Sequence, residues 1–376
     1  MSSSTTAAVT LLALLTAGLS ARAPAQAQDI NTGDATGAYH TSFCPRLEAE
    51  LKQAKFSHTC KTSQGTADNL KRVAADPRQV GFGQLDILAL EGVLTGAPAP
   101  VALLRRDDVR ECLFAVTRNK DVAAYGDLAA NAARLRFILP PADSGSAGTF
   151  RYLKSIDAEG IGRATAVTNA ASTDDAIRQA LSADDTVTLF VQFPDPENAR
   201  FKLVGELGGH FVPVIDRAIL RAEAGTEKIY FAQETQVANA TWVKSGAKVV
   251  TACTPLIVFT GIPERISGDK ARQDQKDLIA TVRALKSEAM LPAESTFARW
   301  IRRSKEFSGA STEQLLKLSE EARERAKPMI ERAKDVGGKA IEAAKPALEK
   351  ATEMGKQAIE KAEDMMKTKP PAEPKK

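Results

Sequence analysis

Apolar and polar residues alternate along this sequence in a way that predicts short strands separated by amphipathic helices. A helical run around Leu47 and Leu51 precedes a β-compatible run over 56–62, and a second helical run around Leu70 leads to a predicted strand and turn over 80–86. The order of strand, helix and strand is typical of an α/β protein. We therefore predict an α/β fold for this part of the chain.

Two loops rich in Gly, Ser and Thr lead into these helices, over residues 31–39 and 62–69. Such loops present free backbone N–H groups and hydroxyls at a helix N-terminus, where negative charge is favoured. In an open α/β sheet, ligands bind beyond the carboxyl ends of the strands. Gly, Ser and Thr are also ordinary cap and turn residues, so one loop alone fits a structural role. Two such loops side by side favour half of a cleft for a small ligand.

A second α/β unit follows along the chain. It includes a predicted strand at 136–139, a polar glycine loop at 140–149 that enters a helix, and a densely apolar strand at 186–193. We expect the chain to cross to this second lobe near Arg118 and to return near Glu234.

The first lobe is then discontinuous, with residues 28–117 and 235–307 on either side of a second lobe of residues 118–234. Amphipathic helices predicted over 269–286 and 295–306 would pack on the first lobe. Two crossings between lobes form a hinge, and closure over a ligand between the lobes follows from that arrangement.

Residues 308–367 predict a helical extension rich in Lys, Glu and Ala. The sequence from Lys327 repeats after 18 residues, so an apolar stripe returns to the same helix face. Three interpretations compete: a partly disordered helix, a helix over 311–367 that binds a protein partner or itself as in a coiled coil, and a membrane-surface helix. The third is weakest, because the polar face is mixed in charge and lacks large aromatic anchors. Residues 368–376 are predicted to be disordered.

The N-terminal residues predict an export signal. An apolar run over 7–19 is too short to span a bilayer, and it is followed by overlapping A-x-A motifs over 23–27. We expect a signal peptide of residues 1–27, cleaved after Ala27 or after Ala25, and a periplasmic protein. No Lys or Arg precedes the apolar run, so retention of the segment as a weak anchor stays open.

Composition narrows the functional class. The chain has 376 residues, of which 43% are apolar and 5% aromatic, so two domains with aliphatic cores fit its length. A net charge of +4 from 51 basic and 47 acidic residues is close to balance. Nucleic-acid binders usually carry a clustered basic face, and we expect no nucleic-acid partner.

Four cysteines, Cys44, Cys60, Cys112 and Cys253, are even in number and sparse, as in a protein of an oxidising compartment. Cys44 lies in the first turns of a predicted helix and Cys60 near the end of the next strand, positions that a βαβ unit brings close together. A Cys44–Cys60 bridge would leave Cys112 with Cys253. Four cysteines allow three pairings, and the sequence does not choose among them.

A zinc site is the alternative for part of this set. His40 precedes Cys44 by one helical turn and His58 precedes Cys60 by two residues, which puts four zinc-ligating side chains on adjacent elements. An oxidising compartment favours pairing of the thiols instead. We therefore predict no metal site and no cofactor.

Catalytic signatures are absent from the sequence. It has no H-E-x-x-H, no Walker loop, no G-x-S-x-G and no G-x-G-x-x-G. Paired acidic residues such as Asp174 and Asp175 fall at predicted turns and helix starts, where they cap helices. We predict that the protein is not an enzyme, with a zinc hydrolase built on the His/Cys cluster as the enzymatic alternative.

Several of these motifs together resemble the TAXI family of solute-binding proteins, which serve tripartite ATP-independent periplasmic (TRAP) transporters. The first lobe carries Thr32-Gly-Asp-Ala-Thr-Gly-Ala-Tyr39, Ser63-Gln-Gly-Thr-Ala-Asp-Asn69 and Gly81-Phe-Gly-Gln-Leu-Asp86. In the second lobe, Asp143-Ser-Gly-Ser-Ala-Gly-Thr149 is similar to the family's Gly/Ser loop. The resemblance covers residues 29–260.

The resemblance implies a two-lobed type II periplasmic-binding-protein fold, here with a C-terminal amphipathic helical extension. It also implies a small anionic ligand, such as an amino acid or dicarboxylate, and TRAP membrane subunits as partners. Arg151 and Arg163 are candidates for a carboxylate clamp. The residues expected at the cleft are Thr36, Tyr39, Ser63, Thr66, Asn69, Gln84, Ser144, Ser146 and Thr149.

A second hypothesis is a periplasmic sensor or adaptor. In it the lobes are a scaffold, and the C-terminal helix binds a protein partner.

Overall fold

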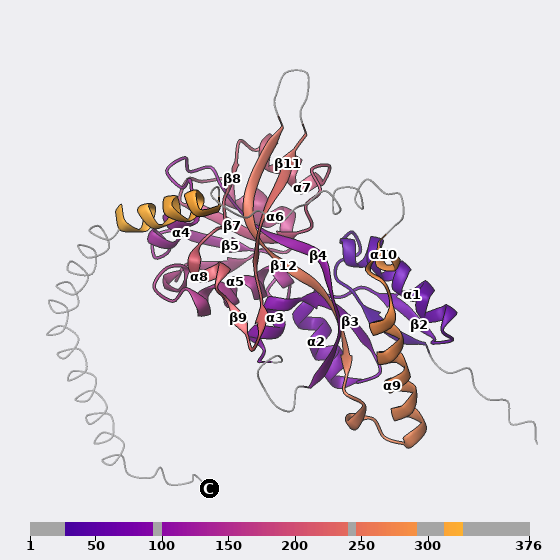
Figure 1. Ribbon diagram of the computed structural model, residues 1–376. Helices are drawn as coiled ribbons and strands as arrows, with labels where there is room; N and C mark the ends of the chain where they lie inside the picture. The colour runs from indigo at the N-terminus through magenta and orange to yellow at the C-terminus, as the bar shows by residue number, and fades with distance from the viewer. Residues whose placement is uncertain (1–26, 93–99, 240–245, 292–311, 326–376) are drawn as a thin grey trace, which may run out of the picture.

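A mixed β-sheet forms the framework of the protein (Figure 1). The structure, a computed structural model, describes residues 27–92, 100–239, 246–291 and 312–325. In the described part the strand order is β2-β1-β3-β12-β4-β7-β5-β6, with β11 paired to β12 and β8 paired to β4.

The strands are β1 (Gln28–Asn31), β2 (His58–Lys61), β3 (Val80–Gln84), β4 (Val101–Thr117), β5 (Arg136–Leu139), β6 (Val167–Asn169), β7 (Thr186–Gln192), β8 (His210–Val212), β9 (Glu223–Ala224), β10 (Glu227–Lys228), β11 (Phe231–Ala238) and β12 (Ala247–Gly261). The helices are η1 (Tyr39–Phe43), α1 (Cys44–Gln53), α2 (Thr66–Ala75), α3 (Leu85–Leu90), α4 (Tyr125–Ala130), α5 (Gly145–Ile156), η2 (Ile161–Arg163), α6 (Thr173–Ala180), α7 (Ala199–Glu206), α8 (Arg217–Leu220), η3 (Pro263–Arg265), α9 (Asp269–Ala284) and α10 (Ser287–Met290), followed by helical residues 312–325.

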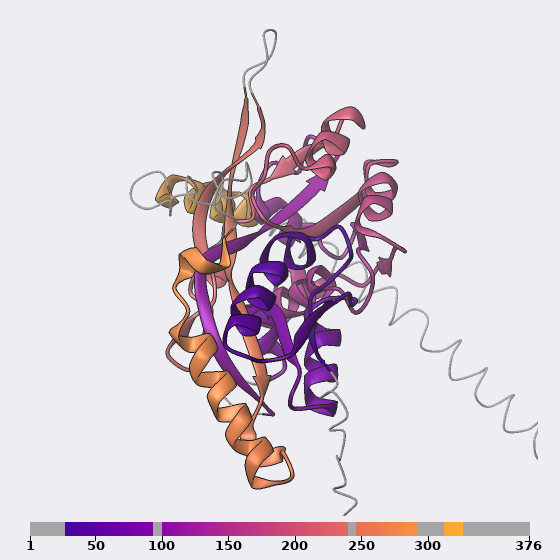
Figure 2. The same ribbon diagram turned by 90° about the vertical axis from the view of Figure 1, so that its right-hand side faces the viewer.

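Two lobes are joined through the middle of this sheet. In the first lobe β1 pairs in parallel with β2 and β3, and in the second β5 pairs in parallel with β6 and β7. The long strands β4 and β12 run antiparallel to each other between these groups and connect the lobes (Figure 1). Helix α9, predicted from the sequence, packs against the first lobe (Figure 2). This is the two-lobed α/β fold expected from the sequence.

The connecting strands contribute to the cores of both lobes. Leu104 of β4 and Val258 of β12 belong to the first-lobe core, whereas Phe114 and Cys253 pack with Phe190 in the second lobe. The chain therefore passes between the lobes inside two continuous strands. The exact lobe boundaries given by the sequence stay predictions.

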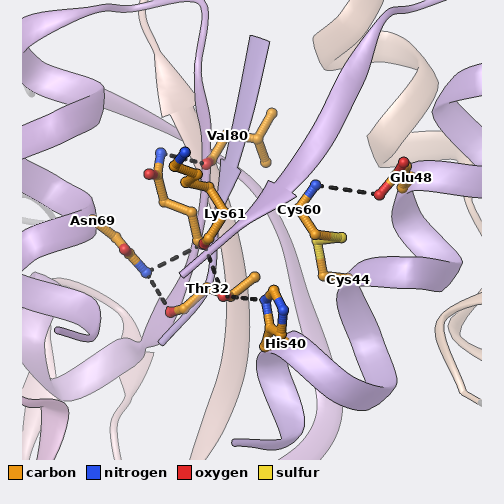
Figure 3. The surroundings of a disulfide bond; sticks show 9 residues. Thr32, His40, Cys44, Glu48, Cys60, Lys61, Asn69 and Val80 are labelled. Atoms are coloured by element: carbon orange, nitrogen blue, oxygen red, sulfur yellow. Dashed lines mark hydrogen bonds between the residues drawn. A yellow bond between two sulfur atoms is a disulfide. The ribbon is translucent and has the colours of Figure 1, made fainter. Parts of the chain in front are cut away.

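Both disulfides are present in the structure. Cys44 of α1 is bonded to Cys60 of β2 (Figure 3), and Cys112 of β4 is bonded to Cys253, its register partner in β12. The structure thus selects one of the three pairings that the sequence left open. The second bridge ties together the two strands that connect the lobes.

The zinc alternative is contradicted by the first disulfide, because the bonded sulfurs of Cys44 and Cys60 cannot act as thiolate ligands. The His40 Nδ1 atom is instead hydrogen-bonded to the Thr32 hydroxyl at 3.1 Å, and the ring of His58 lies 3.3 Å from a backbone carbonyl. In the described part of the chain no group of His, Cys, Asp and Glu is placed to hold a metal ion.

Apolar packing also joins the lobes beside the connecting strands. Leu85 and Leu88 of α3 share one core cluster with Phe150 and Leu153 of α5. Helix α3 follows β3 of the first lobe and α5 follows β5 of the second, so this cluster crosses the junction. The lobes are in direct contact here.

Helical residues 312–325 pack on the second lobe, next to α4 and α8 (Figure 1). Leu316 and Ala322 are buried, and Arg323 forms ion pairs with Asp157 and Asp216. This part of the predicted extension belongs to the folded second lobe.

Several predictions fall outside the described residues. They are residues 1–26 of the signal peptide, the helix over 295–306, and residues 326–376 of the extension and tail. Among the residues that are described, no helix is long and apolar enough to cross a membrane.

Candidate functional site

A cavity of about 450 Å³ lies between loops of the two lobes. The first lobe contributes the loop after β1 and the turn before α2. The second lobe contributes the turns before α5 and α6, with the end of β7 and a side chain from α7. The residues that line it are Gly33, Asp34, Ala35, Thr36, Gly37, Ala38, Tyr39, Ser63, Gln64, Gly65, Thr66, Gln84, Glu111, Pro141, Ser144, Gly145, Ser146, Ala171, Ser172, Thr173, Asp174, Val191, Gln192, Phe193 and Arg200.

Three helices, α2, α5 and α6, begin at this cavity. Their cap residues Gly65, Ser144 and Ser172 all line it. The Ser144 hydroxyl accepts the N–H of Ala147 at 3.2 Å, and the Ser172 hydroxyl accepts the N–H of Asp175 at 3.1 Å. The remaining first-turn N–H groups have no partner within the helix. They make the cavity wall favourable for negative charge.

The turn before α2 touches the turn before α5. Gly65 has a φ of +121°, which favours glycine, and a Cβ atom there would approach the Gly145 nitrogen to 2.9 Å. At Gly145 a Cβ atom would lie 2.0 Å from the Gln84 Oε1 atom. Glycine at these two positions lets the lobes approach each other at the cavity.

Seven of the nine residues predicted from the sequence line the cavity. They are Thr36, Tyr39, Ser63, Thr66, Gln84, Ser144 and Ser146. The structure therefore brings together loops that are far apart in the sequence.

Asn69 does not line the cavity. Its Nδ2 atom donates to the carbonyl oxygens of Asn31, Thr32 and Phe82, at 3.2, 2.7 and 2.8 Å (Figure 3 shows its place beside β1). The side chain holds the ends of β1 and β3 together. It supports the loop that forms the cavity wall.

Thr149 is the second predicted residue that lies away from the cavity. Its hydroxyl donates to the Asp86 Oδ2 atom at 2.6 Å, and the Tyr230 hydroxyl donates to the same oxygen at 2.8 Å. Burial raises the pKa of Asp86 to about 6, although these hydrogen bonds lower it. The group joins α3 to α5 at the contact between the lobes.

Glu111 of β4 is a lining residue that was not predicted from the sequence. Its carboxyl group is buried, and the Tyr39 hydroxyl donates to its Oε2 atom at 2.5 Å. Burial raises the pKa of Glu111 to about 8, with the Tyr39 hydrogen bond lowering it and Asp86 raising it further. One signal was available: strand alternation places Glu111 on the same face as Val109 and Leu113, which are apolar.

Arg200 of α7 was also missed. Its Nε atom lies 2.9 Å from Asp174 Oδ1, its Nη1 atom donates to Gln192 Oε1 at 2.7 Å, and its Nη2 atom lies 3.7 Å from Asp34 Oδ2. Asp34 belongs to a first-lobe loop and Asp174 to the second lobe. Arg200 therefore links the two lobes across the cavity.

The predicted clamp residues lie elsewhere. Arg151 donates to the carbonyl of Ala142, and Arg163 donates to the carbonyls of Ala129 and Ala130. Neither lines the cavity. Among the described residues that line the cavity, Arg200 is the one basic side chain.

The cavity combines hydroxyls, amides, backbone N–H groups at helix starts and a few charged side chains from both lobes. Its lining, as described, holds no His, Cys or Lys that could activate a nucleophile. The arrangement can enclose a small polar molecule and bond to it from two sides.

The sequence matches no protein-family model and no curated protein. Among solved structures, the GluR0 ligand-binding core in complex with L-glutamate is 10% identical, with a TM-score of 0.41, over 74% of this chain and 100% of that chain. MatC from Rhodopseudomonas palustris with bound malate is 11% identical, with a TM-score of 0.39, over 81% and 99%.

A binding-protein component of an ABC phosphonate transporter from Pseudomonas aeruginosa is 13% identical, with a TM-score of 0.37, over 82% and 99%. The resemblance to the TAXI family stays a prediction.

Proposed function

We propose that the protein is a periplasmic solute-binding protein that captures a small organic ligand bearing a carboxylate between its two lobes. The observation that carries the proposal is the cavity itself, where helices α2, α5 and α6 from both lobes begin at one space. A carboxylate at these N-termini would accept backbone N–H groups that have no partner within the helices.

Hydroxyl groups complete this part of the site. Ser63 and Thr66 lie at the start of α2, and Ser146 lies in the first turn of α5. A ligand that bonds to both lobes binds the closed arrangement more tightly than an open one. This difference in affinity sets how strongly the ligand stabilises closure. The continuous strands β4 and β12 provide the hinge.

A TRAP-type membrane transporter is the proposed recipient of the ligand. This part rests on the TAXI resemblance, and the periplasmic location rests on the predicted signal peptide together with the two disulfides. Uptake into vesicles that carry the membrane subunits should require added binding protein. Equal uptake without the protein would remove the transport role.

The test of the binding proposal is a thermal-shift screen with amino acids, 2-oxo acids and mono- and dicarboxylates. A ligand that binds only the native state adds about 2.7 kcal/mol of stability at a hundredfold excess over its dissociation constant. Ser63→Ala should reduce the shift, whereas Ser182→Ala, an exposed serine away from the cavity, should leave it unchanged. A screen in which no compound raises the melting temperature contradicts the proposal.

A further inference from the structure

Charges on the cavity wall restrict the ligand beyond its carboxylate. Three acidic residues line the described cavity, Asp34, Glu111 and Asp174, against one basic residue, Arg200. A ligand with negative charge only would bring that charge close to Asp34 and Asp174, and it would bring no cation to the carboxyl group of Glu111. Like charges in a partly enclosed site repel each other more strongly than they do in water.

Arg200 is already engaged by protein groups. Its guanidinium contacts Asp174, Gln192 and Asp34, and its side chain is only 19% exposed. A second carboxylate on the ligand would have to compete with these contacts. Arg200 is therefore poorly placed to bind the far end of a dicarboxylate.

Unlike Arg200, which already has acidic partners, the buried carboxyl group of Glu111 has no cation beside it in the described part of the chain. Glu111 is only 9% exposed, and among the described residues Tyr39 is the hydrogen-bond partner of its carboxyl group. A buried carboxylate is costly unless a cation or several donors compensate it. A ligand ammonium has three donors and a positive charge, which are the groups this carboxyl lacks.

We propose that the ligand is a zwitterion, with its carboxylate at the N-termini of α2 and α5 and a protonated amine at Glu111. The ligand class is then an amino acid, and dicarboxylates without an amine are poor ligands. This inference rests on the proposed binding function, which it makes more specific.

Protonation supplies a second signature. Burial raises the pKa of Glu111 to about 8, so its carboxyl group is mostly protonated in the empty cavity at pH 7. The titratable groups that act on it are Tyr39, through the hydrogen bond, and Asp86, while Arg200 faces the same cavity. Binding an ammonium favours the charged carboxylate, so complex formation at pH 7 releases a proton.

The experiment compares ligand pairs that differ by the amine alone: L-glutamate with glutarate, L-aspartate with succinate, and L-norvaline with pentanoate. Calorimetric titrations at pH 7 are run in two buffers that differ in ionisation enthalpy. We expect the amine-bearing member of the best-bound pair to bind at least about tenfold more tightly, with proton release into the buffer. Equal binding of both members, or proton uptake with a dicarboxylate, overturns the inference while the binding function stands.

Glu111→Gln tests the residue. The carboxamide still accepts the Tyr39 hydroxyl, and we expect the preference for the amine to fall to within about threefold and proton release to disappear. The matched control is Asp185→Asn, an exposed acid paired with Arg136 away from the cavity, which should keep both. A variant that folds and keeps the full preference removes Glu111 from the site. If Glu111→Gln does not fold, the wild-type ligand pairs decide alone, and failure of every compound to bind rejects the binding function itself.

Discussion

At the scale of single residues, the polar groups around the cavity differ in what they do. Ser63 and Ser144 present hydroxyls at helix starts that line the space, whereas Asn69, with the same polar character, uses its amide to bond three backbone carbonyls. Glu111 belongs to neither group. It is a buried acid with a raised pKa that lines the cavity, which makes it a candidate for ligand binding.

Glu111 should make the protein less stable as the pH rises. Between its ordinary pKa of 4.5 and its native value of about 8, the folded protein holds a proton that the unfolded chain has lost. The folded state binds more protons in this window, so the free energy of unfolding falls as the pH increases. Asp86, with its pKa raised to about 6, acts in the same direction at lower pH.

Glu111→Gln removes the Glu111 contribution. The free energy of unfolding of the variant minus that of wild type should be larger at pH 8 than at pH 5, by more than about 1 kcal/mol. Urea denaturation at the two pH values measures this difference. The Asp185→Asn variant should show no such gain, because Asp185 is exposed. If the difference between variant and wild type is the same at pH 5 and pH 8, the Glu111 carboxyl group of the folded protein is ionised at both pH values.

At the scale of elements, local patterns predicted more than long-range ones. The glycine loops before α2 and α5 were predicted because a turn and a helix start are encoded by adjacent residues. Arg200 and Glu111 reach the cavity from α7 and β4, and their places depend on how distant elements pack. Thr149 was expected at the cavity because it ends the Gly/Ser motif of the TAXI resemblance. Helix α5 already begins at Gly145, however, and within this helix the Thr149 hydroxyl donates to Asp86.

The packing of helical residues 312–325 on the second lobe can be tested through Arg323. The Nη1 and Nη2 atoms of Arg323 donate to Asp157 at 3.0 and 2.7 Å, and its Nε atom lies 3.1 Å from Asp216 Oδ2. The guanidinium carbon lies 5.6 Å from the centroid of the Tyr125 ring. Arg323→Ala leaves two buried carboxylates without their cation, and we expect a loss of about 2 to 4 kcal/mol in urea denaturation. Arg325→Ala, two residues further along the helix, should cost less than about 0.5 kcal/mol. Equal stability of the two variants would mean that this helix is not part of the folded lobe.

At the scale of the whole molecule, the sequence predicted two α/β lobes with a cleft between them, and the structure has that form. The way in which the lobes are joined was harder to predict. β4 and β12 each continue through the junction, because antiparallel pairing over their length and the Cys112–Cys253 bridge hold them together. Core contacts between α3 and α5 add to this connection. Motion of the lobes would therefore bend two linked strands.

The central claim is that this cavity binds a small organic ligand. Native mass spectrometry of the purified protein with an equimolar mixture of amino acids and carboxylates tests it most directly. The account predicts one bound small molecule per chain with the mass of an amino acid, reduced by Ser63→Ala and retained in Ser182→Ala. A bound molecule whose amount Ser63→Ala and Glu111→Gln leave unchanged, or a protein that remains empty in the whole mixture, would contradict it.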